Sequence, residues 1–157
     1  MNELSPQRPT RTIANVPDGM QPMVLARLVQ QRIEAAPDDA ASLVFVARDG
    51  RRMQRMADVL SAMLPGHTIL TLPAWDCLPY DRVSPNNVTI AARMNTLAAL
   101  TSGAKGAIVL TAVNALIQKL PPRDVVETMS FSAAVGRVVD SEKLIAWAAN
   151  NGYLRVP

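Results

Sequence analysis

LPAWDCLPYDRVSP, residues 72–85, is the stretch around which the rest of the chain is arranged. It holds three prolines, a tryptophan, a tyrosine and the only cysteine of the chain. Each proline fixes its own φ and moves the residue before it away from the helical basin, so the stretch should be an extended, stiff loop. A stiff loop keeps its side chains in place, and this loop is where any contact surface should be sought.

The run after this loop predicts a helix with a charge on its apolar face. Its apolar positions recur at the three- and four-residue steps of a core-facing helix, at Ile90, Met94, Leu97 and Leu100. Arg93 falls on the same face, where an unpaired charge would be costly. The nearest acids in the loop are Asp76 and Asp81. We therefore expect Arg93 to form a buried ion pair with one of them, which would fix the loop to the helix.

The polar and aromatic groups of the loop admit a catalytic or a structural interpretation. An acid–base site needs a second titratable group in a cleft, and the sequence shows none at this point. We favour the structural role, with both aromatic rings covering the sheet edge and packing beneath the loop. The alternative is that the rings are a contact point for a partner. The residues of this structural motif are Trp75, Asp76, Pro79, Tyr80, Asp81 and Arg93.

Apolar runs alternate with amphipathic runs up to Pro122, which predicts an α/β fold. Strands are expected at 12–16, 42–47, 67–72 and 106–112. The continuous apolar run 42–47 is typical of a strand buried on both faces. Two intervening helices have clear apolar faces, formed by Leu25, Leu28, Val29 and Ile33 and by Met53, Met56, Ala57, Leu60, Met63 and Leu64. The order predicts three layers around a mainly parallel sheet, with the loop 72–85 at the carboxyl ends of its strands, where ligands usually bind.

Asp18 and Gly19 lie between the first expected strand and the first helix, where an ATPase carries its phosphate loop. Such a loop needs several glycines, a lysine for the phosphates and a Ser or Thr for magnesium, but no Gly-Lys-Thr occurs in the sequence. No acidic pair follows an apolar strand to hold magnesium. We therefore predict no catalytic residues, no cofactor and no metal ligands. The alternative is a nucleotide-binding domain of the ATPase or helicase class with an atypical phosphate loop.

The densest basic group of the chain lies at the start of the second helix and consists of Arg48, Arg51, Arg52 and Arg55. The formal net charge of +3 is small for a nucleic-acid binder. We interpret the group as a solvated helix surface, with Asp49 capping the helix. The alternative is a weak, sequence-independent contact with DNA phosphates.

The composition argues against several other kinds of site and protein. The sole histidine, His67, has no second ligand type nearby, which argues against a metal site. The sole cysteine, Cys77, excludes a disulfide within the chain and fits a reducing compartment. No apolar run reaches membrane-spanning length, and the first residues lack a signal core. We expect a soluble, cytoplasmic protein without a membrane contact or a small-molecule substrate.

The pattern L-P-x-W-D-x-L-P-Y-[DE]-x-x-S-P, followed by R-[ML]-x-T-L-x-x-L, resembles the N-terminal region of the bacterial transcription-repair coupling factors, the Mfd family. The matching positions are Leu72, Pro73, Trp75, Asp76, Leu78, Pro79, Tyr80, Asp81, Ser84, Pro85, Arg93, Met94, Thr96, Leu97 and Leu100. The similarity continues through residues 107–122 and more loosely through residues 135–156. The same region is similar to the first domain of the repair helicase UvrB.

The resemblance implies a domain organisation. Residues 1–10 would be a disordered leader, and residues 11–122 would form a UvrB-like α/β domain, a degenerate version of the helicase domain 1a. Residues 125–139 alternate like a strand and turn, and Asp140 or Ser141 can cap a helix that ends at Asn150. Residues 123–157 would thus begin a second, small domain of the UvrA-recruiting type, truncated in this chain.

The resemblance also implies a function. The chain would be a non-catalytic scaffold and interaction module of a transcription-coupled DNA repair factor, which helps to recruit the nucleotide excision repair machinery. Its expected partners are UvrA and the other domains of the parent protein. The parent would be an ATP-dependent DNA translocase whose motor is not represented here. UvrB also has a long aromatic hairpin that handles damaged DNA, and the loop 72–85 is too short to hold one.

Overall fold

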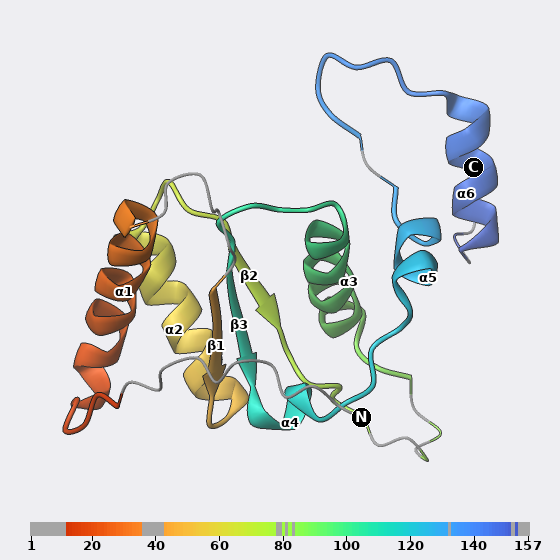
Figure 1. Ribbon diagram of the computed structural model, residues 1–157. Helices are drawn as coiled ribbons and strands as arrows, with labels where there is room; N and C mark the ends of the chain where they lie inside the picture. The colour runs from red at the N-terminus through yellow and green to blue at the C-terminus, as the bar shows by residue number, and fades with distance from the viewer. Residues whose placement is uncertain are drawn as a thin grey trace, which may run out of the picture.

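The computed structural model describes residues 12–35, 43–77, 80, 82, 84–131, 133–151 and 153. Its centre is a sheet of three parallel strands in the order β1-β3-β2, formed by β1 (Leu43–Ala47), β2 (Ile69–Leu72) and β3 (Ile108–Ala112). Helices α1 (Gln21–Ala35) and α2 (Gly50–Met63) lie on one side of the sheet, and α3 (Asn87–Thr101) lies on the other (Figure 1). The predicted α/β class with a parallel sheet is confirmed.

The remaining elements are short. A 3-10 helix, η1 (Asp18–Met20), precedes α1, and α4 (Val113–Leu116) follows β3 directly. After the double proline the chain forms α5 (Arg123–Thr128), beside α3, and then α6 (Ser141–Asn150) (Figure 1). Asp49 caps α2 as predicted, because its carboxylate accepts a hydrogen bond from the Arg52 backbone N–H at 2.8 Å.

The main core lies between the sheet and the helices α1 and α2. The predicted helix faces are largely confirmed, since the buried positions include Leu25, Val29, Met53, Met56, Ala57, Leu60 and Leu64. Ile33 and Met63 are exceptions, with 43% and 40% of their surfaces exposed. Both stand in the last turn of their helices.

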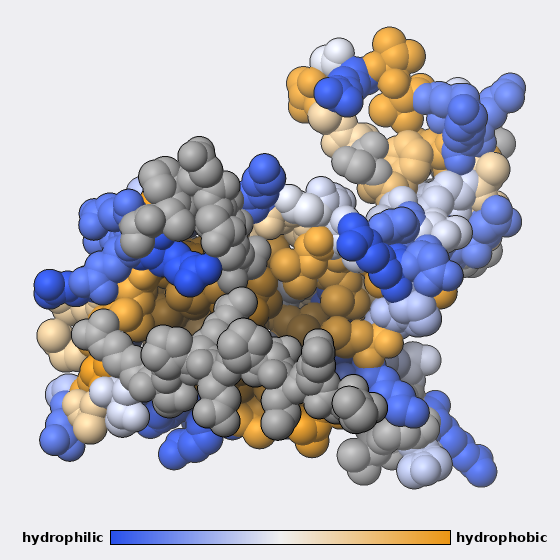
Figure 2. Space-filling view, in the orientation of Figure 1, coloured by the Kyte–Doolittle hydropathy of each residue, from blue (hydrophilic) through white to orange (hydrophobic). Residues whose placement is uncertain are grey.

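The prediction that the strand at 42–47 is buried on both faces is wrong. Val44 is 59% exposed and Val46 is 39% exposed, whereas all five residues of β3 are buried. The strand order explains the difference, because β1 is an edge strand and α3 packs over β2 at the opposite edge. In the space-filling view, hydrophobic side chains are visible over the strands, between the α1 and α3 sides (Figure 2).

Two further strand predictions are wrong. Residues 12–16 form no strand: they are largely exposed, and Asn15 has a φ of +57°. The region expected to alternate as strand and turn begins instead as α5, whose Val126 is buried with Leu72 and Leu97. The predicted helix that Asp140 caps and Asn150 ends is confirmed as α6, with the Asp140 carboxylate accepting from the backbone N–H groups of residues 142 and 143.

Candidate functional site

The side chain of Arg93 holds the loop 72–85 against α3. Arg93 is 1% exposed, and its Nη1 donates to the Pro73 carbonyl oxygen at 2.6 Å and to Gln118 Oε1 at 3.3 Å. Its guanidinium carbon lies 4.3 Å from the centre of the Trp75 ring, a cation–π contact. Burial lowers the pKa of Arg93, but an arginine remains charged at any physiological pH.

Gln118 belongs to the contacts of this loop, and the sequence interpretation missed it. Its Oε1 also accepts from the Trp75 backbone N–H at 3.0 Å, so one amide oxygen links the loop, α3 and the segment after β3. The two partners in that bond are 43 residues apart in the chain. A glutamine in a mostly apolar run carries no local signal for this role, because only the parallel strand order brings it to the loop.

The expected Arg93–Asp76 ion pair is wrong. The Asp76 carboxylate instead accepts from the Asn86 backbone N–H at 3.2 and 3.3 Å and from Thr89 Oγ1 at 3.4 Å, so it stabilises the turn into α3. No carboxylate of the described residues pairs with Arg93, and its Nε and Nη2 are buried without a hydrogen-bond partner there. The other acid considered, Asp81, lies outside the described residues, as does Pro79.

Two buried threonines fix the end of β2, from which the loop emerges. Thr96 Oγ1 donates to the Thr71 carbonyl oxygen at 2.6 Å, and Thr111 Oγ1 donates to the Leu72 carbonyl oxygen at 2.9 Å. Both threonines are at most 2% exposed. The last residues of β2 and the first residue of the loop are therefore held by buried side-chain hydrogen bonds from α3 and β3.

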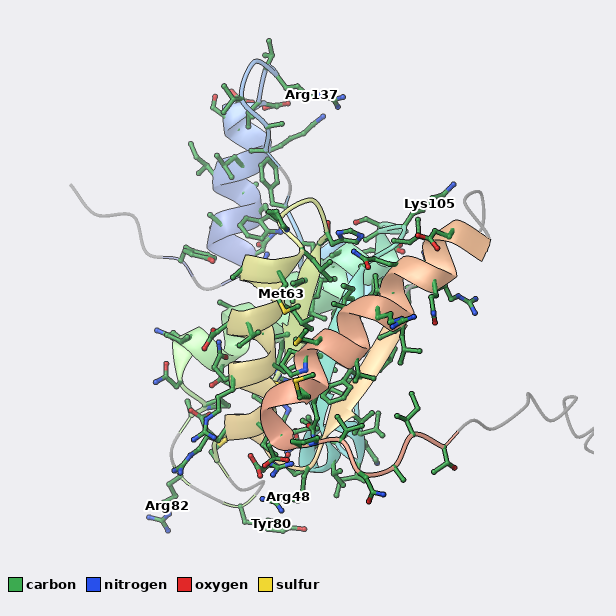
Figure 3. All side chains as sticks on the ribbon, turned by 90° about the vertical axis from the view of Figure 1, so that its left-hand side faces the viewer. Arg48, Met63, Tyr80, Arg82, Lys105 and Arg137 are labelled. Carbon is green, nitrogen blue, oxygen red and sulfur yellow. The ribbon has the colours of Figure 1, made fainter. Side chains whose placement is uncertain are left out.

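The two aromatic residues of the loop have different surroundings. Trp75 is half-buried beneath Arg93, as expected. Tyr80 is 96% exposed, so the expectation that it packs beneath the loop is wrong. Arg48, Tyr80 and Arg82 lie at the same end of the molecule, where the strands end (Figures 1 and 3). This end of the molecule therefore exposes an aromatic ring and cationic side chains.

The four arginines at the start of α2 do not act as one free basic group. Arg52 forms an ion pair with Asp18, and Arg48 Nε lies 3.4 Å from Asp49 Oδ2. Hydrogen bonds from the Arg52 backbone and the Arg48 side chain lower the pKa of Asp49. Arg51 and Arg55 are exposed, and no carboxylate of the described residues pairs with them.

Asp18, at the place where the sequence would put the phosphate loop of an ATPase, forms an ion pair with Arg52. Asp18 also accepts from Gln21 Nε2 at 3.1 Å. A cavity of about 200 Å³ beside the pair is lined by side chains that include Gln21, Phe45 and Arg52. In the described part of the chain, no three His, Cys, Asp or Glu side chains gather to hold a metal ion.

The chain is similar to a set of curated bacterial proteins that share one name. It is 32% identical over 123 residues to the transcription-repair-coupling factor of Myxococcus xanthus, covering 74% of this chain and 10% of the relative. It is 27% identical over 123 residues to that of Escherichia coli K12, with 78% of this chain and 10% of the relative covered. The chain belongs to the transcription-repair coupling factor family.

A shorter match fits the same assignment. The transcription-repair-coupling factor of Rickettsia bellii is 39% identical over 61 residues, which is 39% of this chain and 5% of the relative. No profile of a known protein family matches the chain. The chain spans about a tenth of the length of the Myxococcus and Escherichia relatives, and the matches are consistent with the N-terminal region of a coupling factor. No helix of the described segments has both the length and the apolar character of a membrane span.

Proposed function

We propose that this chain is a non-catalytic scaffold module of a transcription-coupled DNA repair factor and helps to recruit the nucleotide excision repair machinery through UvrA. Its family supports the repair context. In this proposal residues 11–122 are the UvrB-like domain and residues 123–157 open the UvrA-recruiting domain. ATP-driven translocation on DNA belongs to other parts of a cytoplasmic parent protein.

The observation that carries the non-catalytic role is the ion pair between Asp18 and Arg52. Asp18 stands in the turn just before α1, and the N-terminus of a helix is where backbone N–H groups commonly face a phosphate. A carboxylate at this position repels a phosphate group and engages the nearest arginine. The sequence also has no Gly-Lys-Thr motif whose lysine could hold a triphosphate, which supports the proposal.

Isothermal titration calorimetry with Mg·ATP and Mg·ADP tests the non-catalytic role. We expect no saturable binding by the wild-type chain. The matched variant Asp18→Asn removes the carboxylate and releases Arg52. We expect that this variant also does not bind nucleotide, because the glycines and the lysine of a phosphate loop are missing. Saturable binding of either nucleotide to the wild-type chain at micromolar concentration would contradict the proposal.

Biolayer interferometry with purified UvrA tests the recruiting role. The loop before α6 carries Val135 and Val138, both fully exposed apolar side chains in the region assigned to recruitment. We expect Val138→Asp to weaken UvrA binding, while the control Val88→Asp, at a 75% exposed position in the first turn of α3, leaves it unchanged. If Val138→Asp binds UvrA as tightly as wild type does, this loop is not part of the recruiting surface.

A second candidate function, weak sequence-independent DNA binding, is favoured by one observation. Arg51 and Arg55 stand four residues apart on α2 and are exposed, as is the nearby Arg48. Fluorescence anisotropy with labelled duplex DNA at several salt concentrations tests it. Binding that weakens steeply with salt, and that falls in the double variant Arg51→Gln, Arg55→Gln, would support DNA contact. Binding unaffected by that variant would exclude this surface.

A further inference from the structure

A later segment of the chain, residues 117–128, rests on the start of the loop 72–85. Gln118 Oε1 accepts hydrogen bonds from the Trp75 backbone N–H at 3.0 Å and from Arg93 Nη1 at 3.3 Å. One side chain of this segment is therefore bonded both to the loop and to the arginine that holds the loop against α3.

Gln118 attaches the stretch between α4 and α5 to the loop. Ile117 and Leu120 are 81% and 48% exposed, and Lys119 is exposed as well, whereas Gln118 is half-buried. A stretch with few buried contacts opens at low cost. The hydrogen bonds of the Gln118 side chain should therefore contribute much of what keeps this stretch closed.

The second attachment of the segment is made by α5. Val126 is 1% exposed and lies in one buried cluster with Leu72, the last residue of β2, and with Leu97 of α3. Arg123 Nη2 adds a solvent-exposed hydrogen bond to the Thr101 carbonyl oxygen at 2.5 Å. Because Leu72 is also the first residue of the loop, the start of the loop contacts the segment at two points, before α5 and within it.

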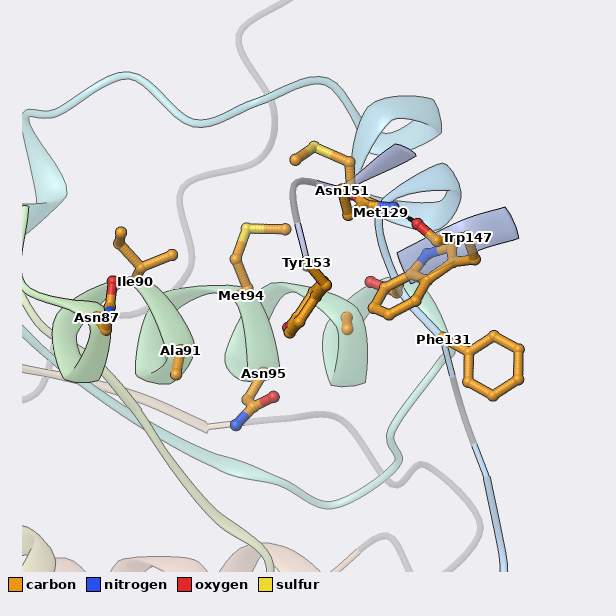
Figure 4. A pocket seen from close by; sticks show the side chains of 12 residues that line it. Asn87, Ile90, Ala91, Met94, Asn95, Met129, Phe131, Trp147, Asn151 and Tyr153 are labelled. Atoms are coloured by element: carbon orange, nitrogen blue, oxygen red, sulfur yellow. Dashed lines mark hydrogen bonds between the residues drawn. The ribbon is translucent and has the colours of Figure 1, made fainter. Parts of the chain in front are cut away.

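The chain after α5 forms one side of a groove along α3. The groove has a volume of about 800 Å³, and its lining includes Met94 and Asn95 of α3 and the rings of Phe131, Trp147 and Tyr153. Figure 4 shows Trp147 and Tyr153 over α3, with Met94 and Asn95 beside them. The ring centres of Phe131 and Trp147 are 5.5 Å apart. A movement of α5 would therefore shift the aromatic side of this groove.

The loop also reaches the solvent, where other molecules can contact it. Tyr80 is 96% exposed, and Arg82 is exposed as well. Three prolines restrict the backbone of the loop. A displacement of Tyr80 should therefore be passed on to the start of the loop, where the segment 117–128 is attached.

From these contacts we infer that the loop 72–85 and the segment 117–128 are one coupled unit, which opens and closes together and which Gln118 holds closed. A contact at Tyr80 then changes the order of α5, and with it the groove along α3. Since coupling between two sites is reciprocal, a contact at α5 acts equally on the loop. The cluster between α2 and the sheet is not part of this unit. The inference does not depend on the proposed function.

The sole cysteine of the chain reports the opening of the loop, because Cys77 is half-buried there. The measurement is the rate at which its thiol reacts with DTNB in the folded 157-residue chain. Gln118→Leu removes the acceptor and should raise this rate about fivefold. Gln118→Glu keeps an acceptor oxygen and adds a charge facing Arg93, so the rate should stay at or below that of wild type. The matched control Gln54→Leu, at an exposed position of α2, should leave the rate unchanged.

The same reaction tests the coupling from the α5 side. Val126→Ala removes buried contacts with Leu72 and should raise the Cys77 rate at least about threefold. Val125→Ala makes the same change at the neighbouring position of α5, which is 37% exposed, and should leave the rate unchanged.

Modification of Cys77 with N-ethylmaleimide tests the coupling from the loop side, because the adduct adds bulk at a half-buried position. Hydrogen–deuterium exchange is then followed by mass spectrometry in the modified and unmodified chains. The adduct should speed exchange in residues 72–77 and in α5, and should leave exchange in α2 unchanged.

Three results would overturn the inference. One is a Cys77 thiol that reacts no faster in Val126→Ala or Gln118→Leu than in the matched controls. Another is an adduct that speeds exchange in the loop and leaves α5 at the unmodified rate. The third is exchange that rises in α2 as much as in α5, since the contacts would then belong to the global core. These measurements use neither UvrA nor a nucleotide, so their outcome is separate from the tests of the proposed function.

Discussion

The two faces of the sheet are stabilised in different ways. On the α1 and α2 side, the core is a cluster of aliphatic and methionine side chains, and none of the buried polar or charged residues described belongs to it. On the α3 side, the apolar cluster is small, and the buried polar residues Arg93, Thr96 and Thr111 bond to backbone carbonyls of residues 71–73. The α1 and α2 face is stabilised mainly by the burial of apolar side chains. On the α3 face, buried hydrogen bonds also fix the start of the loop 72–85.

The largest effect is expected from a cavity in the aliphatic face. Leu60 is fully buried in the cluster between α2 and the sheet. Leu60→Ala should lower the free energy of unfolding by about 3 kcal/mol, within the range for buried leucines, while the loop contacts of the other face stay intact. Urea denaturation followed by circular dichroism measures the loss. A loss below about 1 kcal/mol would show that this face is not the main core.

A somewhat smaller loss is expected from Arg93→Ala on the opposite face. The substitution leaves the Pro73 carbonyl without its donor and uncovers the Trp75 ring, so we expect a loss of about 2 kcal/mol. Trp75 fluorescence in the Trp147→Phe background should report a changed loop. Arg93→Lys is the matched control: it keeps the charge and should recover only part of the stability. An Arg93→Ala chain with unaltered stability would contradict the structural role of this residue.

The side-chain hydrogen bonds of the buried threonines allow the contribution of a single bond on the α3 face to be measured. Thr96→Val keeps the shape of the side chain but removes the hydroxyl that donates to the Thr71 carbonyl. We expect a loss of about 1 kcal/mol, the usual net value of one buried hydrogen bond. Ala98→Ser, on the partly buried groove side of α3, is a control that changes polarity without touching the loop. If Thr96→Val were as stable as wild type, this bond would contribute nothing.

The smallest effect is expected at the cap of α2 and depends on pH. The pKa of Asp49 is lowered below its usual 3.8, so its carboxylate favours the folded state above that pH, and the contribution disappears as the pH falls through the folded pKa. Asp49→Asn keeps the cap acceptor without the charge. Wild type should therefore be slightly more stable than Asp49→Asn at pH 7 and equal to it at the lowest pH. A difference in melting temperature that does not change with pH would contradict this.

The sequence predicted the α1 and α2 face of the sheet better than the α3 face. The 3.6-residue periodicity of α1 and α2 identified most of the buried residues, because the helical repeat decides which side chains of a helix face the sheet. The periodicity also placed Arg93 inside. It did not identify Gln118 as the partner of the loop, because that contact depends on the order of the strands, which no local pattern records.

The same limit explains the errors on β1 and Tyr80. A continuous apolar run predicts a buried strand, but edge position is a property of the whole sheet, and β1 has its valines exposed. Tyr80 was expected inside because large rings usually are, yet it is 96% exposed. The groove on α3 was not predicted at all, since its walls come from segments that are distant in sequence.

The outer side of β1 has a practical consequence for handling the protein. Within the described residues no strand pairs with this side, and Val44 and Val46 stand exposed beside it. Unpaired backbone groups next to exposed valines are a template for pairing with another chain. Concentrated samples should therefore self-associate over time, and a lysine in place of Val44 should keep them monomeric in light scattering.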